Sequence, residues 1–140
     1  MRSWLAPIQS PAFAAMRFVF GVLFMCHGLQ KLFGLFGGHM FPLGSQLGMA
    51  GVIEAFGGAL IALGLFTPIV AFIACGEMAV AFFTQHFPRG AVPIQNGGEL
   101  AVLYCWAFLF IAAHGAGPFS LDALVFGRPR RQARSSAARA

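Results

Sequence analysis

The chain has 140 residues, of which 59% are hydrophobic and only 9% are charged. Ordinary soluble domains carry about 25% charged residues. A soluble domain of this length could not bury so much apolar surface, whereas a bilayer can cover it. The composition therefore excludes an ordinary soluble domain and indicates a single integral membrane domain.

The net charge of +5 arises mainly at the C-terminal end of the chain. Five of the nine basic residues follow the last apolar stretch, and they are Arg128, Arg130, Arg131, Arg134 and Arg139. A basic tail beside a membrane span is typical of a cytoplasmic segment, and it also attracts anionic lipid. No basic stripe is interleaved with aromatic residues, so the sequence does not favour a nucleic acid as a partner.

Four apolar stretches are long enough to cross a bilayer, since a helix needs about 20 apolar residues to span a hydrocarbon core of about 30 Å. They cover residues 15–35, 48–66, 69–87 and 98–115. We therefore predict an all-α fold, a four-transmembrane-helix bundle formed by residues 15–125. Residues 1–14 are expected to lie along the membrane interface with Trp4 as an anchor, and residues 126–140 to form a basic cytoplasmic tail.

The distribution of basic residues predicts the orientation of the bundle. Arg2, Arg17 and the tail lie on one side, whereas Arg89 lies on the other, with Lys31 approaching it from within the first span. The positive-inside rule then places both termini in the cytoplasm and the two longer loops outside.

Small residues recur along one face of the second predicted span. Gly51, Ala55, Gly58 and Ala62 are spaced at i, i+4, i+7 and i+11. This spacing favours close contact with a neighbouring helix in a membrane.

The three cysteines, Cys26, Cys75 and Cys105, each stand alone in an apolar stretch. There is no C-x-x-C motif, so the sequence predicts no dithiol pair. We expect these residues to act as small buried apolar side chains.

Ionisable residues occur within the spans, where charge is costly and usually marks a functional site. At a rise of about 1.5 Å per residue, Lys31 and Glu99 fall about 10 Å outward of the membrane midplane. His27 and Glu54 fall about 3–5 Å outward, and Glu77 lies near the centre. We therefore predict a polar pocket that opens to the outside, binds a ligand or handles protons, and contains these five residues.

A purely structural role for these charges is the alternative. Lys31 could pair with Glu54 or Glu99 only to order the helices, and Arg17 could pair with Asp122 at the inner side. However, one cation faces two or three carboxylates, so either a carboxylate holds a proton or another cation binds. No close metal-ligand motif is present, so no metal site is predicted.

Several short motifs together resemble one family. The first span reads R-x-x-x-G-x-x-x-x-x-H-G-x-x-K from Arg17 to Lys31, and Glu54 is followed by Gly57-Gly58. L-G-L-F-T-P, N-G-G-E and H-G-A-G-P-F-S-L-D follow further along the chain. As a set, these motifs resemble the DoxX family of small four-helix bacterial membrane proteins, over about residues 15–125.

The resemblance implies a multi-pass protein of the bacterial inner membrane. It also implies a subunit or partner of a membrane oxidoreductase system, including sulfur-compound oxidation coupled to quinone, or of a thiol-stress response. The residues that match the family pattern are Arg17, His27, Lys31, Glu54 and Glu99, whereas Glu77 is not assigned to it.

The expected function is therefore that of a membrane subunit of a redox-linked system, binding a quinone or a small sulfur compound in the outward pocket. The sequence shows no electron carrier of its own, so a quinone or an oxidoreductase partner would supply the redox chemistry. Whether the chain is itself an enzyme, and whether it forms a homo-oligomer, are left open. The alternatives are a non-catalytic anchor or assembly subunit and a small proton-coupled transporter, which would have to dimerise.

Overall fold

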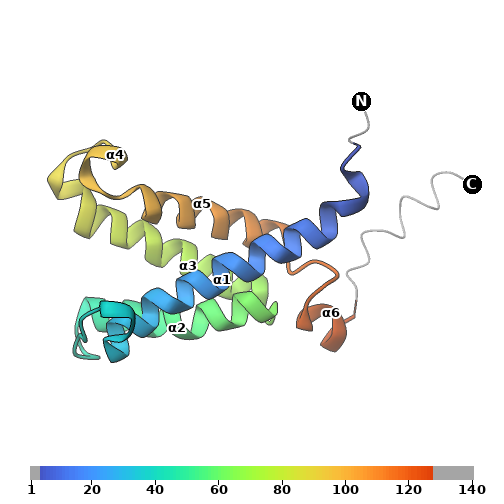
Figure 1. Ribbon diagram of the computed structural model, residues 1–140, viewed down its shortest axis with the longest axis horizontal. Coiled ribbons are helices and arrows are strands. Elements are labelled where there is room, and N and C mark those ends of the chain that lie inside the picture. The colour runs from blue at the N-terminus through green and yellow to red at the C-terminus, as the bar shows by residue number, and fades with distance from the viewer. Residues whose placement is uncertain (1–3, 128–140) are drawn as a thin grey trace, which may run out of the picture.

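The computed structural model describes residues 4–127, and every regular element within them is a helix (Figure 1). The elements in chain order are η1 Ala6–Ile8, α1 Gln9–Phe33, η2 Leu35–Gly37, α2 Gln46–Leu63, α3 Thr67–Ala81, η3 Phe82–His86, η4 Phe87–Arg89, α4 Pro93–Asn96, α5 Glu99–His114 and α6 Leu121–Val125. The basic tail from residue 128 and the first three residues lie outside the described residues, so their predicted roles stay predictions.

Three of the four predicted spans are confirmed in length and composition. The helical segments Ala6–Phe33, Gln46–Leu63 and Thr67–Arg89 are each long and apolar enough to cross a membrane. The fourth, α5, is apolar but has only 16 residues, which corresponds to about 24 Å of helix. Because that is shorter than a hydrocarbon core of about 30 Å, the fourth span stays a prediction.

The helices form two pairs, with α1 packed on α2 and α3 packed on α5. Figure 1 shows the two longer connections, residues 34–45 and 87–98, at one end of the molecule, which we call the loop end. The start of α1, the turn between α2 and α3, and α6 lie at the opposite end, the turn end (Figure 1). The core lies between the pairs, and its fully buried members are Phe24, Ile61, Ala71, Ala74, Phe108 and Ile111.

The α1–α2 contact depends on glycine. A Cβ added at Gly21 would lie 2.5 Å from the backbone nitrogen of Ala62, and one added at Gly28 would lie 2.6 Å from the carbonyl oxygen of Gly51. Both distances are far below van der Waals contact, so the two backbones touch directly. The small-residue face predicted on α2 is therefore confirmed as a helix–helix interface.

At the turn end, Arg17 is buried and binds backbone rather than a carboxylate. Its guanidinium donates to the carbonyl oxygens of Ile61 at 2.5 Å, Ala62 at 2.8 Å and Phe119 at 2.7 Å. Ile61 and Ala62 lie in the last turn of α2, where the final carbonyl groups carry the negative end of the helix dipole. The ion pair with Asp122 that the sequence suggested is therefore not formed within 4 Å, because Arg17 has these acceptors.

Asp122 instead caps the start of α3. Its carboxylate accepts hydrogen bonds from the backbone N–H groups of Phe66, at 2.7 Å, and Thr67, at 2.9 Å. Phe66 has φ +50°, a left-handed conformation that is costly for a side chain of this size. The two hydrogen bonds and the favourable interaction of a carboxylate with a helix N-terminus offset that cost.

We predict that Gly28→Ala destabilises the protein by about 1–3 kcal/mol, because backbone atoms on α2 leave no room for the methyl group. Thermal unfolding of the detergent-purified protein measures the change. Gly76→Ala on α3 is the matched control, since nothing lies within 4 Å of a Cβ added there. The control should be neutral or stabilising by about 0.5–1 kcal/mol. Equal effects of the two substitutions would contradict direct contact between the backbones.

Candidate functional site

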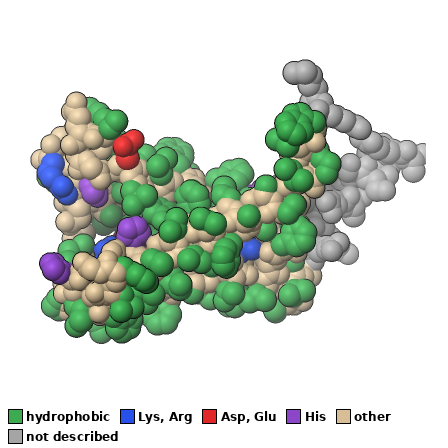
Figure 2. Space-filling model, viewed as in Figure 1, with side chains coloured by type: hydrophobic (Ala, Val, Ile, Leu, Met, Phe, Trp, Pro, Cys, Tyr) green, Lys and Arg blue, Asp and Glu red, His purple; other side chains and the backbone are tan. Residues whose placement is uncertain are grey.

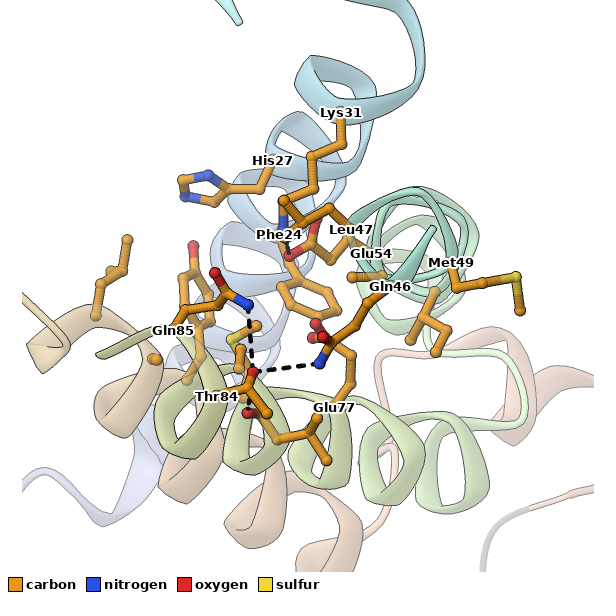
Figure 3. Close-up of a pocket in the computed structure, with 18 of the residues that line it drawn as sticks. Phe24, His27, Lys31, Gln46, Leu47, Met49, Glu54, Glu77, Thr84 and Gln85 are labelled. Carbon is orange, nitrogen blue, oxygen red and sulfur yellow. Dashed lines mark hydrogen bonds and ion pairs between the residues drawn. The ribbon is translucent and has the colours of Figure 1, made fainter. Parts of the chain in front are cut away.

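A cavity of about 580 Å³ lies between α1, α2, α3 and α5 near the loop end. Figure 2 shows a hollow at this end, with basic and histidine side chains around it, and Figure 3 shows the side chains that line the cavity. Phe24 closes it toward the core. The polar side chains in its wall are His27, Lys31, Gln46, Glu54, Glu77, Thr84, Gln85, His86 and Tyr104.

Lys31 and Glu54 form the ion pair at the centre of the site. Lys31 Nζ lies 2.5 Å from Glu54 Oε1, and the two side chains are 24% and 2% exposed. The α1–α2 contact brings them together, because a Cβ added at Gly51 would lie only 2.9 Å from the Cβ of Lys31. The prediction that Lys31 lies close to Glu54 or Glu99 is confirmed, with Glu54 as the partner.

Glu77 adds a second carboxyl group to the same cavity from α3. Figure 3 shows its side chain reaching into the space below Glu54 and Gln46. The Oε2 atoms of both Glu54 and Glu77 are buried and have no hydrogen-bond partner. Buried unpaired carboxylates are very unfavourable, so two carboxyl groups facing one ammonium require a bound proton or a further positive or hydrogen-donating group.

Polar side chains from α2 and η3 form the rim of the cavity. Gln46 Nε2 donates to Thr84 Oγ1 at 3.2 Å, and Thr84 Oγ1 donates to the carbonyl of Val80 at 2.8 Å (Figure 3). Thr84 and Gln85 belong to a π-helical turn that continues α3. Such turns shift the helical register and are frequent at functional sites. Here the turn places Thr84, Gln85 and His86 together in the cavity wall.

Tyr104 is a wall residue that the sequence analysis did not identify. Its side chain is 3% exposed, and its ring lies 5.5 Å from that of Phe24 and 6.1 Å from that of His27. It is the only tyrosine of the chain and stands within an apolar stretch. A buried tyrosine hydroxyl usually needs a hydrogen-bond partner. A single tyrosine within an apolar stretch could therefore have indicated a polar site at this position.

Glu99 lies outside the cavity, which corrects its predicted place in the pocket. It is exposed in the first turn of α5, where the helix dipole favours a carboxylate. On α5 the cavity is lined by Leu100, Ala101 and Tyr104, which occupy a different face of the helix. The depth estimate alone could not distinguish these faces.

Among residues 4–127, no group of three or more His, Cys, Asp or Glu side chains is placed to hold a metal ion. His27 and His86 both line the cavity, from α1 and from the end of η3. The ionisable groups in the wall are one ammonium, two carboxyl groups, two imidazoles and one phenol, and they lie beside two amides and one threonine hydroxyl.

Comparison with known proteins gives two findings. A family model described as DoxX matches residues 12–87 of the chain. An uncharacterised protein of Haemophilus influenzae is 42% identical over 116 residues, which cover 78% of this chain and 87% of that protein. No solved structure matches the chain.

We predict that Lys31→Met destabilises the protein more than Glu54→Gln does. Removing the ammonium leaves the almost fully buried Glu54 carboxylate without a partner, at a cost of about 3–5 kcal/mol. Removing the carboxylate leaves Lys31, whose longer and more exposed side chain can turn toward solvent, at about 1–3 kcal/mol. Thermal unfolding in detergent measures both.

The double variant Lys31→Met/Glu54→Gln should be more stable than the sum of the single effects predicts, because the two side chains interact directly. Arg89→Met removes an exposed cation whose guanidinium donates to the backbone carbonyl of Gln85, and it serves as the control. Additive single effects would show that the ion pair contributes nothing to stability.

Proposed function

Because this chain belongs to the DoxX family and carries apolar helices of membrane-spanning length, we propose that it is a multi-pass subunit of a redox-linked system in the bacterial inner membrane. In this proposal the cavity binds a quinone or a small sulfur compound. An oxidoreductase partner delivers or removes the electrons.

The observation that carries the proposal is the chemistry of the cavity wall. A volume of about 580 Å³ is within the range of small-molecule sites. The wall is mostly apolar, yet it holds an ammonium beside two carboxyl groups whose Oε2 atoms have no partner. A ligand with polar oxygen atoms on an apolar body can form hydrogen bonds with these charged groups and pack against the apolar side chains of the wall.

The side of the cavity between α2 and α3 favours a ligand that is dissolved in lipid. Met49, Ile73 and Val80 line the cavity and are also 55%, 50% and 52% exposed. In a bilayer, exposed apolar side chains in the spans face lipid. An opening bordered by them lets a molecule enter from the hydrocarbon region, which supports a quinone over a water-soluble sulfur compound.

A bound quinone would supply the electron chemistry, and the side chains would bind it and manage protons. Lys31 Nζ and the imidazole of His27 can donate hydrogen bonds to a carbonyl oxygen. Glu54 and Glu77 can accept or release the protons that accompany quinone reduction or oxidation. Tyr104 offers a further hydroxyl from α5.

The proposed topology has four spans, with the turn end in the cytoplasm and the loop end outside. Figure 1 supports it, because the start of α1 and α6 lie at the same end. The arginine-rich tail that follows α6 favours the cytoplasmic side for that end. The bilayer can adapt to a short span such as α5 by local thinning, at modest cost.

We predict that the purified protein binds a short-chain analogue of ubiquinone, and that Glu54→Gln and Glu77→Gln each weaken binding about tenfold or more. Loss of one hydrogen bond to a charged group is worth about 1.5–3 kcal/mol, which corresponds to at least a tenfold change in Kd. Calorimetry in lipid nanodiscs measures the affinity. Glu99→Gln is the matched control, since it removes an exposed carboxylate that does not line the cavity.

Two other outcomes would favour the competing proposals. If the wild type binds no quinone and Glu54→Gln reduces stability while the residual folded protein supports full activity of the partner system, the chain is an anchor or assembly subunit. If the variant instead abolishes proton-coupled uptake of a solute into vesicles, it is a transporter. Mass spectrometry of small molecules that co-purify with the wild type separates these cases further.

We also predict that Gly44→Cys reacts with a membrane-impermeant maleimide in intact cells, whereas Ser136→Cys reacts only after lysis. Gly44 is exposed in the connection between α1 and α2, with open space around it. Ser136 belongs to the basic tail. Labelling of Ser136→Cys in intact cells would reverse the proposed orientation.

A further inference from the structure

Two thiols meet in the interface between α3 and α5. The Sγ atoms of Cys75 and Cys105 lie 3.6 Å apart, in hydrogen-bond contact, and both side chains are half-buried. We propose that Cys75 and Cys105 form a dithiol–disulfide couple within the membrane, which a lipid-permeable two-electron oxidant closes. This would be a redox site on the chain itself, separate from any ligand in the cavity.

The geometry is close to that of a bond. A disulfide has an S–S distance of about 2.05 Å, so the sulfur atoms have to approach by roughly 1.5 Å. The helices that carry them are packed directly against each other. Rotation about the Cα–Cβ bonds and small shifts of two neighbouring helices can supply an approach of this size.

The surroundings decide which oxidant can reach the pair. Cys75 lies in the middle of α3 and Cys105 in the first half of α5, both within apolar stretches. Glutathione is charged and does not enter such a region, whereas a quinone or an uncharged diazene does. Each cysteine is also close in sequence to a residue of the cavity wall. Tyr104 directly precedes Cys105, and Glu77 follows Cys75 by two residues.

The proposed oxidation balances in atoms and electrons between the two thiols and the oxidant. Two S–H bonds break and one S–S bond forms, and two protons and two electrons pass to the oxidant. A quinone becomes a quinol by accepting them, and a diazene becomes a hydrazine. A dithiol reductant reverses the step by exchange through a mixed disulfide.

The test treats the full-length protein in nanodiscs with diamide, an uncharged diazene, and then alkylates it under denaturing conditions. The chain has three cysteines, so we expect three alkyl groups before oxidation and one after it. The intact mass should fall by two hydrogens before alkylation, and peptide mapping should join Cys75 to Cys105. Reduction should restore three alkyl groups.

Cys26 on α1 provides the matched control. Cys26→Ala should still form the disulfide, whereas Cys75→Ala and Cys105→Ala should each keep two reactive thiols after oxidation. Glu54→Gln should form the disulfide as readily as the wild type, because diamide does not need the cavity. Loss of quinone binding and loss of disulfide formation can therefore be told apart. Three alkyl groups after diamide, or a disulfide that includes Cys26, would overturn the proposal.

Discussion

The direct contact between the backbones of α1 and α2 determines where the other parts of the protein lie. Gly21 and Gly28 on one helix meet Gly51, Ala55, Gly58 and Ala62 on the other, and no side chain separates them. At the loop end this contact sets Lys31 against Glu54. At the turn end it brings Arg17 to the last carbonyls of α2. One steric requirement, the absence of side chains along a line of contact, thus positions both the candidate site and the buried arginine.

Much of this arrangement follows from the sequence, because helical periodicity relates spacing to faces and depths. The small-residue face of α2 and the approach of Lys31 to Glu54 needed only the rise and the repeat of a helix. Glu99 shows the limit of that reasoning, since residues at equal depth can point in different directions. Arg17 and Asp122 show another limit: both bind backbone groups at helix ends, and these acceptors and donors appear only once the turn is folded.

The irregular turn beside the cavity and the contacts between different spans were the least predictable features of the structure. The π-helical turn Phe82–His86 changes the register of α3 beside the cavity, and no residue type marks it in advance. The sulfur contact of Cys75 with Cys105 joins residues of different spans, so no short cysteine motif in the sequence indicates it. Tyr104 differs, because a single tyrosine in an apolar stretch is visible in the sequence, although its partners are not.

The contacts between the two helix pairs are distributed unevenly along the molecule. Asp122 joins the start of α3 to α6 at the turn end, and aromatic rings from Phe13 to Phe24 pack α1 against α5 between that end and the cavity. Beyond Phe24 the cavity lies between the pairs, where the ring of His27 contacts that of Tyr104 and Gln46 donates a hydrogen bond to Thr84 at the rim. The packing between the pairs is therefore closer toward the turn end than it is beside the cavity. A molecule that contacts both Lys31 on α1 and Glu77 on α3 would add interactions between the two pairs where the cavity otherwise keeps them apart.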